Sequence, residues 1–220
     1  MNAMPHREQP DGGGGRAVAV AIGIVGAALL GFGILLSRLA PSSPTDLGEG
    51  VTLLPVPLEI PQFALVDHRG EPFDRSRLAG RWSLLFFGYT YCPDICPATL
   101  QRLAEVQDRL PNETQVVFVS VDPERDSQER IAEYVGYFHS ALIGVTGSPT
   151  EIDKLARAVG AFHRKAPGDA AGEGYLVDHS VSLFLVDPGA RLEALMRDPS
   201  NPQRFLRLLA KIESMNRGTP

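Results

Sequence analysis

Residues 82–97 read WSLLFFGYTYCPDICP, an apolar run that leads directly into a pair of cysteines. The near-continuous apolar character of Trp82–Phe87 is typical of a strand that is buried on both faces of a sheet. Leu100, Leu103 and Val106 then recur at the spacing of one helix face. The stretch therefore predicts a buried strand, a short turn and a helix. Its cysteines lie at the carboxyl end of the strand, the edge at which open α/β sheets place their sites.

Cys92 and Cys96 are the only cysteines among the 220 residues. On a helix, residues four apart have Cβ atoms about 5–6 Å apart, whereas a disulfide needs about 3.5–4.5 Å. Two thiolates that hold one metal ion at roughly 2.3 Å each tolerate the wider separation. The start of a helix also lowers the pKa of a thiol, which favours the thiolate form. The spacing favours a metal site and leaves a redox dithiol open.

Strand and helix signals alternate from Phe63 to the end of the chain. Ser148-Pro149-Thr150-Glu151 is a capping box with proline at the first helical position, and Asp126 with Glu129 marks another helix start. The other elements are expected as a hairpin at 63–73, strands at 116–121, 141–145, 181–186 and 192–196, and helices at 149–161 and 202–214. This order predicts an α/β, thioredoxin-like fold with a central sheet flanked by helices.

Residues 17–37 contain no charged side chain and are flanked by Arg16 and Arg38. Twenty-one helical residues span about 31 Å, enough to cross a hydrocarbon core of about 30 Å. The run is too long for the apolar core of a cleaved signal peptide. We therefore expect one N-terminal transmembrane helix in a chain with four parts: a short tail (1–16), a membrane anchor (17–37), a Pro-rich tether (38–60) and a thioredoxin-like domain (61–220) that carries the cysteine pair.

The distribution of charge predicts where the domain lies. Arg7 and Arg16 precede the apolar run while only Arg38 lies close behind it, which favours a cytoplasmic N-terminus. Residues 46–220 carry eighteen Lys and Arg against twenty-four Asp and Glu, an acidic balance that argues against a nucleic-acid partner. Arginine greatly outnumbers lysine, and no amphipathic transit peptide precedes the run. The expected location is the bacterial inner membrane, single-pass, with the C-terminal domain in the periplasm.

A second candidate segment, GYLVDHS at residues 174–180, stands immediately before the expected strand 181–186. In thioredoxin-like oxidoreductases a proline at this place lies against the dithiol, whereas this chain offers His179. Two thiolates and one imidazole suit a soft cation such as Cu(I). Asp178 is either a partner that orients the imidazole or a turn residue.

Three segments, YTYCPDICP (89–97), SVDPERD (120–126) and VDH (177–179), resemble the Sco/SenC family of membrane-anchored, thioredoxin-fold copper proteins for cytochrome c oxidase assembly. The resemblance implies binding of Cu(I) and Cu(II) through Cys92, Cys96 and His179. It also implies delivery of copper to, or thiol reduction of, the copper-A site of oxidase subunit II. A copper donor protein and a thiol reductant would then be further partners.

Other functions use the same residues. Cys92 and Cys96 equally serve a membrane-tethered thiol-disulfide oxidoreductase that keeps oxidase cysteines reduced, so enzymatic activity stays open. A redox or copper sensor is a further alternative, whereas a peroxidase is disfavoured because its upstream proline is missing. The 122–126 segment is expected to be a turn and helix start, with a catalytic role as the alternative. His68, His139 and His163 are expected to be surface or structural histidines.

Overall fold

The computed structural model describes residues 31–32, 45–46, 50–111, 114–166, 175–197, 201 and 203–217. The chain divides into two units, residues 1–42 and 43–220. Gly31 and Phe32 are helical; the rest of the expected anchor, 17–37, and the whole of the tail, 1–16, lie outside the described residues. Among the described residues, no helix has both the length and the apolar character that a membrane crossing requires.

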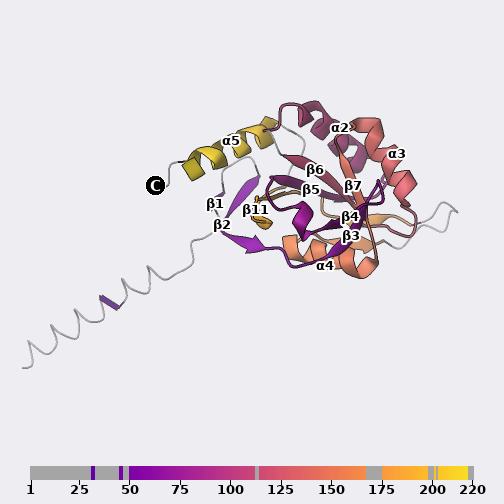
Figure 1. Ribbon diagram of the computed structural model, residues 1–220, viewed down its shortest axis with the longest axis horizontal. Coiled ribbons are helices and arrows are strands. Elements are labelled where there is room, and N and C mark those ends of the chain that lie inside the picture. The colour runs from indigo at the N-terminus through magenta and orange to yellow at the C-terminus, as the bar shows by residue number, and fades with distance from the viewer. Residues whose placement is uncertain are drawn as a thin grey trace, which may run out of the picture. The chain divides into compact units, whose positions relative to one another are not determined.

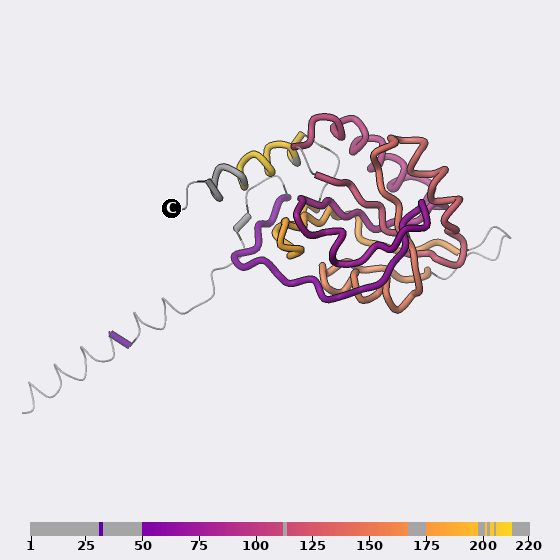
Figure 2. The backbone as a smooth tube through the Cα atoms, in the orientation of Figure 1, coloured from indigo at the N-terminus to yellow at the C-terminus, as the bar shows by residue number. Residues whose placement is uncertain are grey.

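A nine-stranded sheet forms the centre of the second unit (Figure 1), and Figure 2 traces the backbone through it. The strand order is β1-β2-β11-β10-β5-β6-β7-β3-β4, in which β5, β6 and β7 are parallel and the other neighbours antiparallel. A separate antiparallel pair consists of β8 and β9. The strands are β1 Thr45–Asp46, β2 Val51–Glu59, β3 Ala64–Asp67, β4 Pro72–Asp74, β5 Ser83–Gly88, β6 Gln115–Ser120, β7 Ile143–Thr146, β8 His163–Lys165, β9 Val177–His179, β10 Leu183–Val186 and β11 Arg191–Met196.

The two central strands, β5 and β6, are buried along their whole length. Their aromatic and β-branched side chains suit a sheet that is covered on both faces. The Phe86 and Phe118 rings, which are register partners, lie 6.2 Å apart. Parallel neighbours need crossover connections, and these are helices α2 (Ile95–Gln107) between β5 and β6 and α3 (Gln128–Phe138) between β6 and β7. The predicted thioredoxin-like core is confirmed.

Helices cover both sides of the sheet: α2 and α3 lie on one side and α4 (Pro149–Val159) on the other (Figure 1). Helix α4 begins as predicted, with the Ser148 hydroxyl accepting from the Glu151 amide and Pro149 in the first turn. The Glu151 side chain, however, accepts from the Ala64 amide in β3 instead of closing the capping box. Gly160 ends the helix with a φ of 73°. Helix α5 (Gln203–Arg217) follows the last strand, and a short 3₁₀ turn, η1 (Arg75–Arg77), follows β4.

The structure places the second half of the expected tether in the sheet. Residues 51–59 form β2, which pairs with β11 on one side and with β1 on the other. Pro55 and Pro57 suggest a tether from sequence because proline cannot donate to a strand ladder. Both lie inside an irregularity of the β2–β11 pairing, which passes from Leu53 to Leu58. The bulge therefore accommodates the prolines within a strand.

The start of α3 also differs from the expectation. Its N-cap is Ser127, whose hydroxyl accepts from the Arg130 amide. Asp126, the expected cap, is buried and accepts other hydrogen bonds. Because Ser127 caps the helix, the Asp126 carboxylate is available to accept hydrogen bonds from buried groups such as the Ser120 hydroxyl.

Candidate metal centre

The cysteine pair lies where β5 ends and α2 begins. The Cys92 amide donates to the Tyr89 carbonyl at 3.2 Å, which closes the turn, and Cys96 is the second residue of α2. The spacing argument assumed that the two cysteines lie on one helix. They do not, because Cys92 precedes Ile95, the first residue of α2. Both are buried free thiols. Pro97 occupies the first turn of the helix, where a missing N–H costs little.

His179 ends β9 and reaches the cysteines from the other side of the site. Its Nε2 lies 3.3 Å from the Cys96 Sγ, and its Nδ1 lies 3.1 Å from the Ser180 carbonyl oxygen. A carbonyl only accepts, so Nδ1 carries the proton and Nε2 is the nitrogen available to a metal. The Phe86 and Tyr89 rings meet the imidazole edge-on, with centroids 6.3 and 5.7 Å away.

The structure therefore brings together the three residues that the sequence singled out. One donor atom from each of Cys92, Cys96 and His179 lies within 4.8 Å of the others. Asp178, whose role stayed open, is exposed and pairs with Arg164 at 3.1 Å. The Ser180 carbonyl, not Asp178, holds the imidazole.

The two thiols differ in acidity. Hydrogen bonding with the Cys96 side chain lowers the pKa of Cys92 to about 4; burial opposes this shift and His179 assists it. The pKa of Cys96 is raised by the same hydrogen bond, by burial and by repulsion from the Cys92 thiolate. Cys92 is accordingly the thiolate at neutral pH, and Cys96 is the thiol that stabilises it.

A glycine that sequence reasoning missed makes room for the site. A Cβ on Gly88 would lie 2.8 Å from the Cys96 Sγ and 2.8 Å from the Phe118 Cε2. Ordinary contact begins at about 3.4 Å, so a side chain at this position would displace the thiol or the ring. The sequence signal was a glycine at the carboxyl end of a buried strand, a place where backbones often approach other groups closely.

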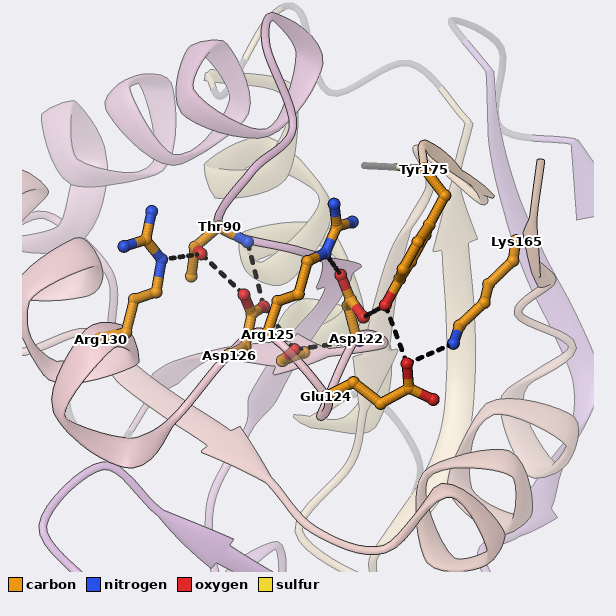
Figure 3. Close-up of polar contacts among 9 residues, drawn as sticks. Thr90, Asp122, Glu124, Arg125, Asp126, Arg130, Lys165 and Tyr175 are labelled. Carbon is orange, nitrogen blue, oxygen red and sulfur yellow. Dashed lines mark hydrogen bonds and ion pairs between the residues drawn. The ribbon is translucent and has the colours of Figure 1, made fainter. Parts of the chain in front are cut away.

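A polar network supports the turn that carries the cysteines (Figure 3). Asp126 accepts from the Thr90 amide at 3.0 Å, the Thr90 hydroxyl at 2.7 Å and the Ser120 hydroxyl at 2.6 Å. Arg130 donates to the Thr90 hydroxyl at 2.8 Å. These contacts tie the start of α3 and the end of β6 to the residue two before Cys92. Asp126 therefore has a fixed structural role in this network, beyond a simple turn.

The other three histidines in the described part of the chain make hydrogen bonds outside the cluster. His68 Nδ1 accepts from the Gly144 amide at 3.1 Å. His139 and His163 pair with Asp108 and Asp153 at 3.3 and 2.9 Å. This agrees with the structural roles expected of them.

The fold and the site define a class: a thioredoxin-like α/β domain whose strand-to-helix junction joins a dithiol to an imidazole. Within that class, the chain belongs to the SCO1/SenC family, whose family model matches residues 55–214.

Individual relatives agree with this assignment. The human mitochondrial protein SCO2 homolog is 35% identical over 195 residues, which cover 82% of this chain and 69% of that protein. The crystal structure of Arabidopsis thaliana ScoI with copper bound has a TM-score of 0.63 at 35% identity, covering 69% of this chain and 95% of that one. The solution structure of apo Sco1 from Thermus thermophilus has a TM-score of 0.63 at 38% identity, covering 74% and 94%.

Proposed function

We propose that this protein binds copper through Cys92, Cys96 and His179 and acts as a metallochaperone for the copper-A centre of cytochrome c oxidase. The observation that carries the proposal is the convergence of two sulfurs and one imidazole nitrogen within 4.8 Å. Thiolate and imidazole ligands together suit Cu(I), and thiolates select it over harder cations. Copper is the ligand bound in the related plant ScoI.

The spacing of the donor atoms fits one ion. Sulfur and nitrogen ligands lie about 2.0–2.3 Å from a metal of this size, so three ligands around one ion are spaced by roughly 4 Å. The observed limit of 4.8 Å needs only a small contraction. Bound copper would supply an ion that exchanges between thiolate sites. Cys92 offers a preformed thiolate for it, Cys96 gives up its proton on binding, and the Ser180 carbonyl holds the imidazole in the metal-binding tautomer.

The proposal includes a place in the cell. The uncharged residues 17–37 would anchor the chain in the bacterial inner membrane, with the C-terminal domain in the periplasm. There the domain would meet oxidase subunit II, a copper donor protein and a thiol reductant. Family membership supports the oxidase role, and the charge around the apolar run supports the orientation.

Copper titration tests the three-ligand site. The reduced full-length chain is titrated with Cu(I) in competition with bicinchoninate, and one ion per chain is expected. His179→Ala should weaken binding at least tenfold, because it removes one of three ligands. His139→Ala is the matched control, since that imidazole pairs with Asp108 outside the cluster. Equal affinity of the His179→Ala variant and the wild type would disprove the three-ligand site.

A membrane-tethered thiol-disulfide oxidoreductase is the second candidate, and the acidity of the thiols favours it. A low-pKa Cys92 beside a high-pKa Cys96 has the arrangement of an attacking and a resolving thiol. Loss of His179 distinguishes the two functions: it should weaken copper binding but leave disulfide exchange largely intact. In a deletion strain, rescue of oxidase activity by added copper indicates delivery, whereas rescue by a reductant indicates thiol reduction. A sensor of copper or redox state would leave the copper-A content of the oxidase unchanged on deletion.

A further inference from the structure

His179 is carried by a strand that stands apart from the main sheet. In the part of the chain that the structure describes, β9 pairs with β8 and not with any of the nine strands of the central sheet. The cysteines, by contrast, follow β5, a strand of that sheet that is buried along its whole length. The third ligand therefore depends on contacts that join the β8–β9 pair to the body of the domain. Those contacts determine how closely the imidazole approaches the sulfurs.

One such contact stands directly before β9. The Tyr175 hydroxyl donates to the Asp122 Oδ1 at 2.6 Å and also lies 3.2 Å from the Glu124 Oε2. Figure 3 shows Tyr175 and Lys165 converging on the turn that follows β6. Lys165, at the end of β8, reaches the Glu124 carboxylate at 2.6 Å. Both strands of the pair are thus attached to the same turn.

Arg125 joins this attachment to the cysteine side of the site. It is ion-paired with the Asp122 carboxylate, which has no exposed side-chain surface, while the Arg125 side chain is 19% exposed. Its guanidinium carbon lies 3.9 Å from the centre of the Tyr175 ring and 5.0 Å from that of Tyr91. Tyr91 directly precedes Cys92. One cation therefore contacts an aromatic ring in each of the two segments that carry the ligands.

A further ring completes the connection. The Arg125 guanidinium carbon is 5.6 Å from the centre of the Tyr89 ring, and that ring meets the His179 imidazole edge-on at 5.7 Å. A shift of the guanidinium would change the packing beside the imidazole as well as the anchor at Tyr175. Lysine could not replace it, because a point charge lacks the planar face that packs on several rings while pairing with a carboxylate.

We propose that Asp122, Arg125 and Tyr175 form a clamp that positions the third ligand against the cysteine pair. The inference rests on the copper site proposed above. The clamp touches neither the metal nor the sulfurs; it acts by holding β9. Loosening it lowers the share of molecules in which the imidazole reaches the ion, while the dithiol keeps its own affinity.

A double-mutant cycle tests the clamp. Tyr175→Phe removes only the hydroxyl, and Cu(I) affinity is measured by bicinchoninate competition in the reduced full-length chain. We expect about five- to tenfold weaker binding, less than the loss when a direct partner of a ligand is removed. The same change in a His179→Ala background should weaken binding no further. Tyr137→Phe is the matched control, since Tyr137 is 82% exposed on α3.

A second variant and a spectroscopic measurement complete the test. Arg125→Lys should weaken binding more than Tyr175→Phe and should also have no effect without His179. Electron paramagnetic resonance of the Cu(II)-loaded chain with ¹⁵N-labelled histidine should show reduced nitrogen coupling in both variants.

The outcomes separate the two proposals. If wild type and His179→Ala bind Cu(I) equally, the copper site fails and the clamp fails with it. If binding depends on His179 but Tyr175→Phe and Arg125→Lys match the wild type, only the clamp is overturned. Equal weakening by Tyr175→Phe with and without His179 also overturns it, because the contact would then support the fold in general.

Discussion

Replacing Gly88 with alanine should damage the site and the core together. The added Cβ would lie 2.8 Å from both the Cys96 Sγ and the Phe118 Cε2. Overpacking of this kind costs about 1–3 kcal/mol, while a Gly-to-Ala change returns about 0.4–1 kcal/mol through the unfolded chain. The expected net loss is about 1–2 kcal/mol of the free energy of unfolding. Displacement of the Cys96 sulfur should also weaken Cu(I) binding, by about tenfold if it loosens one of three ligand bonds.

Two other glycines provide matched controls. A Cβ on Gly136, in α3, meets nothing within 4 Å, so Gly136→Ala should stabilise the protein by about 0.4–1 kcal/mol. A Cβ on Gly144, in β7, would lie 2.1 Å from the Ile131 Cγ2. Gly144→Ala should therefore destabilise the fold without changing Cu(I) affinity.

Urea unfolding followed by circular dichroism gives the stabilities, and bicinchoninate competition gives the affinities. Of the three variants, only Gly88→Ala should lower both quantities. A Gly88→Ala protein that is as stable as Gly136→Ala, or that folds normally and binds Cu(I) as tightly as the wild type, would refute the predicted clash.

Three further predictions concern acidity, capping and the buried network. Because the pKa of Cys92 is lowered to about 4, iodoacetamide should modify Cys92 at a nearly constant rate from pH 8 to pH 6, and the rate should fall only as the pH approaches 4. Cys96→Ala should move this decrease in rate to higher pH, because it removes the hydrogen bond that lowers the pKa of Cys92. A rate that drops about tenfold per pH unit below 8, as for an ordinary thiol, would contradict the assignment. Ser148→Ala should lower the free energy of unfolding by about 1 kcal/mol in urea, through loss of the α4 cap, and an unchanged midpoint would argue against it. Asp126→Ala should cost about 3 kcal/mol by leaving the donors of Thr90 and Ser120 unpaired, and Asp126→Asn should cost less than half as much; equal losses would show that the hydrogen bonds are not responsible.

Short sequence patterns predicted the elements of the fold whose formation depends mainly on neighbouring residues. The apolar run before the cysteines gives β5, the Ser148 box gives α4, and the hairpin around Gly70 gives β3 and β4. The cysteines and His179 were found because their residue types and their places before and after strands are visible in sequence. The thioredoxin-like arrangement then implies that these places meet at one edge of the sheet.

Features that depend on distant partners were not predictable in this way. Residues 51–59 become a strand because β11, more than 130 residues away, accepts them despite Pro55 and Pro57. Strands β8 and β9 have three residues each, too few for the alternation of apolar and polar residues that identifies a strand in sequence. Asp126 looks like a helix cap in sequence, and only the position of Thr90 in space shows which donors it accepts from.

The geometry also links redox state to metal binding. The two thiols supply two of the three donors, and both are free in the reduced protein. A disulfide would draw the sulfurs to about 2.05 Å and remove both thiolates, leaving one imidazole, which is too little to retain a soft cation. One two-electron oxidation thus changes the donor set from three ligands to one. Holding copper and reducing a disulfide of a partner would therefore be mutually exclusive for a given molecule at a given moment, because the two thiolates that bind the metal are the groups that would be oxidised to a disulfide.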